Sequence, residues 1–208
     1  MASGASLPFL PGQYVNMGVP GSSQTRPYSF SSLPKDGLVE FFIRNLPGGA
    51  MSRYLFDHAK PGDTLSISGP YGTFYLRDIV RPQLLLAGGT GLAPFLSMLE
   101  KISGNDQKHP IRLIYGVTDD VDLVEIEKLE AFTARIPGFS FTTCVADQAS
   151  QHARKGFVTN HIVDEHLDGG DIDVYLCGPP PMVDAAQAAF AERSVKPARL
   201  FFEKFNPA

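Results

Sequence analysis

The chain has 208 residues, a length that allows one large domain or two small ones. Hydrophobic residues make up 43% of the sequence and charged residues 19%, a balance that excludes an intrinsically disordered chain and indicates a folded, globular protein. The net charge of −4 disfavours a general nucleic-acid-binding surface, so we expect no nucleic acid among the partners.

The charge is distributed unevenly along the chain. Residues 1–82 carry seven Lys and Arg against five Asp and Glu, whereas residues 83–208 carry eleven against seventeen. The two parts are therefore +2 and −6, and the first is better suited to anions. We predict two domains that meet near Arg81, with residues 1–80 in the first and residues 81–208 in the second.

The first domain consists of short apolar or alternating runs separated by Gly and Pro turn signals. Several short strands with close turns are typical of a small antiparallel barrel. We expect one helix, at residues 52–58, and strands at residues 13–17, 28–31, 38–44 and 64–68.

The second domain alternates continuous apolar strands with helices, a pattern that predicts a doubly wound parallel sheet in an α/β fold. The longest uncharged stretch, residues 83–99, contains three glycines and a proline and is short for a membrane span, so we expect no membrane insertion. The strands are expected at residues 84–87, 111–117, 139–145 and 174–177, and the helices at residues 94–103, 123–134 and 182–194.

Two glycine turns follow strands of this sheet. Gly88–Pro94 (GGTGLAP) runs from a strand into a helix with Pro at its first position, and such a turn offers free N–H groups to a phosphate. It departs from the G-x-G-x-x-G pattern, and a simple strand–helix connection is the alternative. Cys177–Met182 (CGPPPM) ends a later strand, which places Cys177 at the floor of a cleft or, alternatively, as a small buried residue.

The first domain offers matching chemistry. In residues 26–29 (RPYS), Arg can grip a phosphate, Tyr can stack on an aromatic ring and Ser can hydrogen-bond a ring nitrogen. An ordinary barrel strand with a surface Arg is the alternative. Gly48–Ser52 (GGAMS) opens the lone helix and offers N–H groups to an anion, or is only a capped start with Ser52 near the cap. Together these features indicate two bound nucleotides that face each other.

These motifs resemble the ferredoxin-NADP reductase superfamily, and most closely the reductase components of bacterial aromatic-ring dioxygenases of the benzoate type. The resemblance covers residues 10–205. It rests on ordered motifs at residues 11–15 (PGQYV), 26–29 (RPYS), 49–52 (GAMS), 69–72 (GPYG), 88–94 (GGTGLAP), 177–179 (CGP) and 201–205 (FFEKF).

The resemblance implies a flavin-binding barrel followed by a nicotinamide-nucleotide domain, with FAD and NAD as cofactors. The implied catalytic residues are Ser29 near flavin N5, Cys177 beside nicotinamide C4 and Glu203 near the flavin ring. The implied flavin contacts are Arg26, Pro27, Tyr28, Ser29, Ile43, Arg44, Gly49, Met51, Ser52 and Phe205. The implied dinucleotide contacts are Gly89, Thr90, Gly91, Asp119, Cys177, Gly178 and Pro179.

Coenzyme choice depends on the carboxylates that follow strand 111–117. In this superfamily that strand end faces the adenine ribose, where Asp119, Asp120 or Asp122 would accept ribose hydroxyls and repel a 2′-phosphate. The sequence has no Arg or Lys between Arg112 and Lys128 to neutralise that phosphate. We therefore expect a preference for NADH, although one of these Asp residues can instead cap the next helix.

The chain departs from the family pattern in two ways. The cluster cysteines of a preceding ferredoxin domain are missing, because Cys144 and Cys177 are the two cysteines of the sequence. Residues 1–6 come just before the PGQYV motif. In the family, a complete barrel strand normally precedes this motif. We expect a barrel that is incomplete at its amino terminus, with an open edge.

The expected function is a flavoprotein reductase that takes a hydride from NADH onto FAD and passes single electrons to an iron-sulfur protein, within an aromatic-ring oxygenase system. An NAD(P)H:flavin reductase that releases reduced flavin and a non-catalytic nucleotide-binding subunit are the alternatives. Two cysteines cannot form a disulfide framework or a four-thiolate cluster, so we expect no metal in this chain and a cytoplasmic location.

Overall fold

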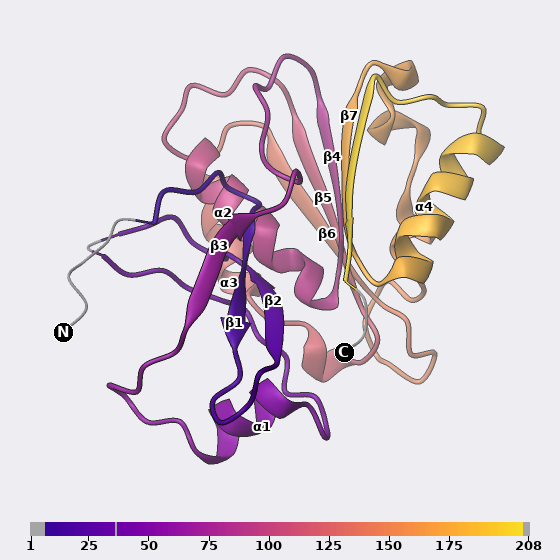
Figure 1. Ribbon diagram of the computed structural model, residues 1–208. Helices are drawn as coiled ribbons and strands as arrows, with labels where there is room; N and C mark the ends of the chain where they lie inside the picture. The colour runs from indigo at the N-terminus through magenta and orange to yellow at the C-terminus, as the bar shows by residue number, and fades with distance from the viewer. Residues whose placement is uncertain (1–6, 36, 206–208) are drawn as a thin grey trace.

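The computed structural model describes residues 7–35 and 37–205, which form two sheets side by side (Figure 1). The first is antiparallel, with strand order β2-β1-β3 and a single helix, α1 (Ala50–Asp57), at its lower end in Figure 1. The antiparallel sheet predicted for the flavin-binding barrel is confirmed. Its strands are β1 (Tyr14–Gly18), β2 (Thr25–Ser29) and β3 (Ile67–Tyr71).

The core of this first unit is small. Met17 and Val19 from β1 and the adjoining turn pack against Met51 from α1, and Tyr28 covers their edge. Apolar side chains at alternate positions of β1 therefore meet the buried face of α1. The expected incompleteness of the first barrel strand concerns residues 1–6, which lie outside the described residues.

Two predictions about these strands are wrong. Residues 38–44 form no ladder, only single bridges from Leu38 to Lys35 and from Phe41 to Phe30, because this segment turns its side chains toward the second unit. The strand predicted at residues 64–68 is shifted to β3, because its pairing with β1 begins at Ile67 and continues past a register irregularity to Tyr71.

The second unit is a five-stranded sheet with order β6-β5-β4-β7-β8, in which every neighbouring pair is parallel. Helices α2 (Leu92–Ile102) and α3 (Ile126–Arg135) cover the face toward the first unit, and α4 (Pro180–Glu192) covers the other (Figure 1). The predicted doubly wound sheet is confirmed. Its strands are β4 (Gln83–Gly88), β5 (Ile111–Val117), β6 (Phe139–Val145), β7 (Asp173–Gly178) and β8 (Arg199–Lys204).

Several boundaries differ from the sequence prediction. Helix α2 begins at Leu92 after a 3₁₀ turn at Gly89–Gly91, so Pro94 is its third residue, where its missing N–H still costs no helical bond. A 3₁₀ turn at Asp120–Asp122 delays α3 to Ile126. Further 3₁₀ turns lie at Val158–His161, Asp164–His166 and Asp168–Gly170. Strand β8 was not predicted, because its alternating burial is typical of a sheet edge.

The two units share a core. Phe74, which follows β3, packs edge-on against Phe95 of α2 and against Tyr175 of β7. The backbone N–H of Gly12 donates to Ser97 Oγ at 3.1 Å, and the N–H of Arg77 donates to Tyr175 Oη at 3.1 Å. No helix among the described residues is long and apolar enough to cross a bilayer.

A buried carboxylate anchors the segment that joins the units. The Asp173 side chain is 0% exposed and accepts hydrogen bonds from Arg199, Arg81 and Gln83. Burial alone would raise the pKa of Asp173, but these hydrogen bonds outweigh it and lower the pKa below its ordinary value of 3.8.

Replacing Asp173 with Ala removes the carboxylate that two partly buried guanidinium groups share. We expect the free energy of unfolding, measured by urea denaturation, to fall by about 3 kcal/mol. Because the pKa of Asp173 is lowered in the folded protein, its contribution to stability is present above pH 3.8 and is lost as the pH falls through the folded-state pKa.

Asp171 provides a matched control, because it also pairs with Arg81, at 3.0 Å, but its side chain is 78% exposed. Asp171→Ala should cost less than about 1 kcal/mol. Equal losses for the two variants would contradict the anchoring role of Asp173.

Candidate functional site

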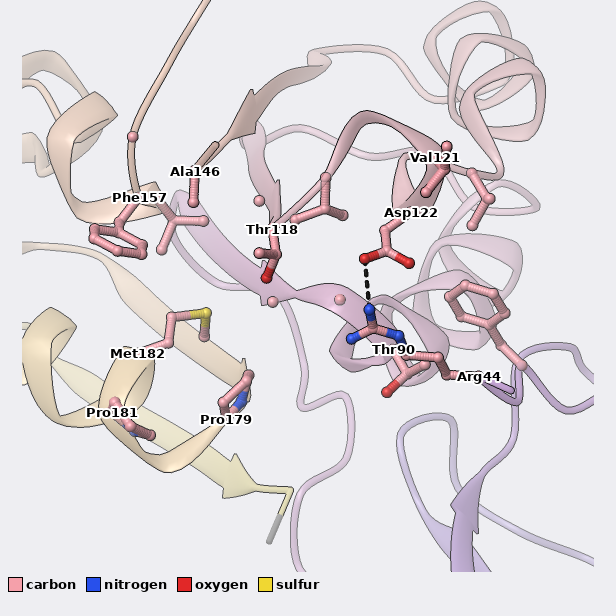
Figure 2. Close-up of a pocket in the computed structure, with 18 of the residues that line it drawn as sticks. Arg44, Thr90, Thr118, Val121, Asp122, Ala146, Phe157, Pro179, Pro181 and Met182 are labelled. Atoms are coloured by element: carbon pink, nitrogen blue, oxygen red, sulfur yellow. Dashed lines mark hydrogen bonds and ion pairs between the residues drawn. The ribbon is translucent and has the colours of Figure 1, made fainter. Parts of the chain in front are cut away.

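A cavity of about 750 Å³ opens at the carboxyl ends of the central parallel strands (Figure 2). The chain adds β5 and β6 on one side of β4 and β7 and β8 on the other, so the sheet reverses its winding beside β4. Ligands of open α/β sheets bind at such a reversal. The strand ends, the turns that follow them and the start of α4 contribute Gly88, Gly89, Thr90, Gly116, Val117, Thr118, Ala146, Pro179, Pro181 and Met182 to its lining.

The two predicted glycine turns meet at the floor of this cavity. A Cβ on Gly91 would lie 2.1 Å from the carbonyl oxygen of Cys177, and one on Gly88 would lie 2.5 Å from Met182 Sδ. Real Cβ atoms essentially never approach backbone this closely, so Gly91 can carry no side chain. Of the predicted phosphate cradle, Gly89 and Thr90 line the cavity, whereas Gly91 packs beneath it.

Cys177 and Glu203 are neighbours across β7 and β8, where they pair in register. Cys177 is 0% exposed, and the pKa of its thiol is raised well above the ordinary value, chiefly by burial and further by the Glu203 carboxyl. Burial also raises the pKa of Glu203 to about 7. At neutral pH Cys177 is therefore a neutral thiol. The Glu203 carboxyl is protonated in part of the molecules at that pH, because its pKa is about 7.

Ser29 approaches the same place from the first unit. It lies opposite Tyr14 across β1 and β2, so the two side chains share one face of the sheet. The Tyr14 ring lies 3.1 Å from where a Cβ of Gly72 would stand, and Glu203 Oε1 lies 3.6 Å from that point. A series of neighbouring residues thus leads from one sheet to the other: Ser29, Tyr14, Gly72 and Glu203.

The first and last residues of this series each have a polar atom that is buried without a hydrogen-bond partner among the described residues: Ser29 Oγ and Glu203 Oε2. A third such atom, Arg81 Nε, still lies 3.0 Å from the Asp171 carboxylate. An unsatisfied buried polar group costs roughly 1–3 kcal/mol. A planar ring with donors and acceptors on its edge would satisfy Ser29 and Glu203, so these residues fit a flavin.

The predicted phosphate contacts of the flavin are available for an anion. Within the part of the chain that the structure describes, the Arg26 guanidinium donates to two neutral acceptors, Thr25 O at 2.9 Å and Gln24 Oε1 at 3.2 Å. Tyr28 is half-buried beside it; burial raises the pKa of its hydroxyl, and Arg26 partly offsets that rise. Pro27 between them is exposed.

Helix α1 offers backbone groups rather than side chains. Its N-cap is Gly49, which has no side chain to cap the helix, and the Met51 side chain is buried in the core. Ser52 Oγ donates to Leu46 O at 3.0 Å and accepts from the Leu46 N–H at 3.2 Å, so it holds its own loop. Ser52 is the third helical residue, and its Oγ also lies 3.2 Å from the carbonyl oxygen of the N-cap Gly49, so the alternative of Ser52 near the cap stays open.

A salt bridge between the two units crosses the cavity wall. Arg44 Nη2 lies 2.7 Å from Asp122 Oδ2, the dashed line in Figure 2. Of the three carboxylates expected near the ribose, Asp122 lines the cavity, Asp120 accepts a hydrogen bond from Ser150 at 2.7 Å, and Asp119 is exposed. The search for Arg or Lys between Arg112 and Lys128 missed this cation, because Arg44 belongs to the first unit.

The remaining predicted residues lie around these groups. Phe205 is partly buried against the core of the second unit, and Pro179 lines the cavity, while Gly178 packs against Gly88. Ile43 is partly buried and does not line the cavity.

Sequence reasoning missed several residues that line the cavity, among them Phe42, Phe56, Thr118, Val121, Phe157 and Met182. The rule that ligands bind at strand ends could have found Thr118.

Two protein-family models match the chain. The oxidoreductase FAD-binding domain matches residues 2–75, and the oxidoreductase NAD-binding domain matches residues 85–188. Among curated relatives, the toluate 1,2-dioxygenase electron transfer component of Pseudomonas putida is 60% identical over 98% of this chain and 61% of its own length. The 2-halobenzoate 1,2-dioxygenase electron transfer component of Burkholderia cepacia is 46% identical over 98% of this chain and 60% of its own length.

Solved structures agree with this likeness. The Amycolatopsis cytochrome P450 reductase GcoB superposes with a TM-score of 0.85 at 35% identity, over 96% of this chain and 62% of that one. The ferredoxin reductase in carbazole 1,9a-dioxygenase gives a TM-score of 0.80 at 28% identity, over 96% and 61%. The chain spans about three fifths of the length of the curated relatives that it matches.

The unpaired Glu203 carboxyl predicts a pH dependence of the flavin-free protein. Its pKa of about 7 exceeds the ordinary 4.5, so the folded state holds the proton more tightly and stability falls as the pH rises from 4.5 to 7. Glu203→Gln should flatten the fall in melting temperature between pH 5 and pH 8. Glu192→Gln, an exposed change on α4, should keep the wild-type slope. An unaltered slope in Glu203→Gln would show that another group titrates.

Proposed function

The chain belongs to the oxidoreductase NAD-binding domain family, and we propose that it takes a hydride from NADH onto FAD and passes single electrons to an iron-sulfur protein. We further propose that it is the reductase part of an aromatic-ring oxygenase system. The main support is the pair of buried polar atoms without a hydrogen-bond partner among the described residues, Ser29 Oγ of the first unit and Glu203 Oε2 of the second. The names of the relatives, electron transfer components of dioxygenases, support the acceptor class.

In this proposal residues 1–80 hold the flavin and residues 81–208 hold the dinucleotide. A bound flavin supplies the exchange between two-electron and one-electron chemistry. The Arg26 guanidinium would bind its phosphate and the Tyr28 ring would pack against the isoalloxazine, while Ser29 Oγ and Glu203 would hydrogen-bond its edge. Met51 would contribute only its backbone, because its side chain is committed to the core.

The second domain would position the coenzyme. The N–H groups of the Gly89–Gly91 turn, which leads into α2, are suited to a pyrophosphate. The close contact between Gly91 and the Cys177 backbone would help to exclude water from the point where the two rings meet. Transfer of a hydride requires no general base, so the residues named here bind, orient and exclude water.

An absorbance spectrum of the purified protein, recorded before and after anaerobic addition of NADH, tests the function directly. We expect bound flavin whose oxidised bands bleach with NADH and return in the presence of an oxidised ferredoxin. Bound flavin that NADH does not bleach would indicate a nucleotide-binding subunit without turnover. Release of reduced flavin during gel filtration would indicate an NAD(P)H:flavin reductase. The cytoplasmic location stays a prediction.

Cys177 is expected to position the nicotinamide without forming a covalent bond, because its thiol is fully buried with a raised pKa. Cys177→Ala should slow flavin reduction by NADH roughly tenfold in stopped-flow measurements, through a looser floor beneath the ring, and leave flavin affinity unchanged. Cys144→Ala removes an equally buried thiol on β6 and should leave the rate unchanged. An unchanged rate of flavin reduction in Cys177→Ala would show that Cys177 contributes only to packing.

Coenzyme choice is expected to depend on the ion pair between Asp122 and Arg44. Asp122 repels a 2′-phosphate and also neutralises Arg44, so the wild-type protein should prefer NADH. Asp122→Asn frees the Arg44 guanidinium, which should raise kcat/KM for NADPH relative to NADH by about tenfold to a hundredfold.

Asp120→Asn is the control, because Asp120 accepts a hydrogen bond from Ser150 and does not line the cavity. Its ratio of NADPH to NADH specificity constants should equal that of the wild type. A wild-type preference for NADPH would overturn the assignment of NADH.

A further inference from the structure

Tyr115 is a fully buried tyrosine of the parallel sheet. It lies on β5, where it pairs with Ala87 of β4 and with Thr143 of β6. Its ring packs in the core that the sheet forms with helices α2 and α3. A phenylalanine ring would fill the same apolar space, and a buried hydroxyl is costly unless it has a hydrogen-bond partner.

The Tyr115 hydroxyl binds the turn that follows its own strand. Its Oη donates to the carbonyl oxygen of Asp122 at 3.1 Å. Burial raises the pKa of Tyr115 to about 12, and the Val124 backbone partly offsets this rise. The hydroxyl therefore keeps its proton at neutral pH and remains a donor to the turn.

This turn carries the acidic end of the large cavity. Two backbone hydrogen bonds close it, from the Asp122 N–H to Asp119 O at 3.0 Å and from the Leu123 N–H to Asp120 O at 3.1 Å. Val121 and Asp122 line the cavity, and Figure 2 shows both on this turn. Hydrogen bonds in short 3₁₀ turns have poor geometry, so contacts outside the turn decide where Asp122 stands.

Asp122 has two such contacts, one from each unit. Its carbonyl oxygen accepts from Tyr115 in the core, and its carboxylate pairs with Arg44 at 2.7 Å. The carboxylate is 23% exposed and the guanidinium 50%, so solvent screens this pair and it contributes little by itself. The buried hydrogen bond from Tyr115 is therefore better suited than the ion pair to fix the turn.

A second side chain holds the turn from the segment that follows β6. Ser150 is buried, and its hydroxyl donates to Asp120 Oδ1 at 2.7 Å. The His152 N–H donates to the same hydroxyl at 2.9 Å, which fixes the serine. Asp120→Asn keeps an acceptor oxygen at this position, so that change leaves this contact in place.

We propose that Tyr115 is a positioning residue for coenzyme choice: its buried hydroxyl holds Asp122 over the cavity, where the carboxylate neutralises Arg44 and repels a 2′-phosphate. This inference rests on the proposed coenzyme site. Without the hydroxyl the turn gains freedom, Asp122 leaves Arg44 for part of the time, and the guanidinium becomes available to a phosphate. Discrimination between the coenzymes thus depends on a residue that does not line the cavity.

The dissociation constants of NAD⁺ and NADP⁺, measured by titration calorimetry, test this role without any turnover. Tyr115→Phe should lower the ratio of the NADP⁺ constant to the NAD⁺ constant about three- to tenfold, the effect of losing one neutral hydrogen bond. In the Asp122→Asn background the same change should leave the ratio as it is, because the carboxylate that Tyr115 positions is already absent. A tyrosine that only supports the fold would weaken both coenzymes equally.

Tyr175→Phe is the matched control. Tyr175 is also fully buried, its hydroxyl hydrogen-bonds a backbone group, the Arg77 N–H at 3.1 Å, and it does not line the cavity. This variant should keep the wild-type ratio. Ser150→Ala loosens the same turn from its other side and should shift the ratio in the direction of Tyr115→Phe. Circular dichroism should show that each variant keeps the wild-type fold.

An unchanged ratio in folded Tyr115→Phe would overturn the inference, as would an equal shift in the Asp122→Asn background. If Tyr115→Phe does not fold, an unchanged ratio in Ser150→Ala overturns it instead. An unchanged ratio in a protein whose flavin NADH bleaches would refute this inference and keep the proposed function. A ratio that Tyr115 controls, in a protein that NADH does not reduce, would do the reverse, and a protein that binds neither coenzyme would refute both.

Discussion

The contact between two glycine turns at the ends of β4 and β7 is the constraint on which the rest of the site depends. Neighbouring parallel strands end at the same edge of a sheet, so the turns that follow them must pass each other. They can do so only because Gly91 lies against the Cys177 carbonyl and Gly178 lies against Gly88. This contact buries Cys177, and the register of β7 with β8 then brings Glu203 beside it.

Apolar packing and ion pairs contribute differently to the junction between the units. Phe74 enters the core of the second unit beside Phe95 and Tyr175, so apolar burial supplies most of the attraction. The ion pairs that cross the junction are partly exposed, Arg44 with Asp122 at 2.7 Å and Lys128 with Glu40 at 3.2 Å, and each contributes only about 0–1 kcal/mol. Charge therefore orients the segment over the cavity more than it holds the units together.

The two buried polar atoms without a partner are stronger evidence for a bound flavin than the cavity is. Most buried polar groups in folded proteins have a partner, because losing the hydrogen bonds of water is costly. Ser29 Oγ and Glu203 Oε2 lack one, and they come from different sheets that meet through Tyr14 and Gly72. A bound ring with polar edges would offset their cost, so these two atoms, rather than any single motif, are the main structural support for a bound flavin.

The sequence by itself determined the elements whose residues act locally. The strands at residues 111–117 and 139–145 were predicted to the residue, because they are apolar runs bounded by turn signals. The glycine turns at residues 88–94 and 177–182 were recognisable because backbone that must approach closely requires glycine.

Only the tertiary structure decided which distant residues meet. Arg44 reaches Asp122 from 78 positions away, and a count of charges between Arg112 and Lys128 cannot detect it. Residues 38–44 lost their predicted strand because their side chains bind the second unit instead of a neighbouring strand. The physical reason is the same in both cases: docking of two domains creates contacts that no local pattern of polarity encodes, whereas strands and glycine turns follow from neighbours in the chain.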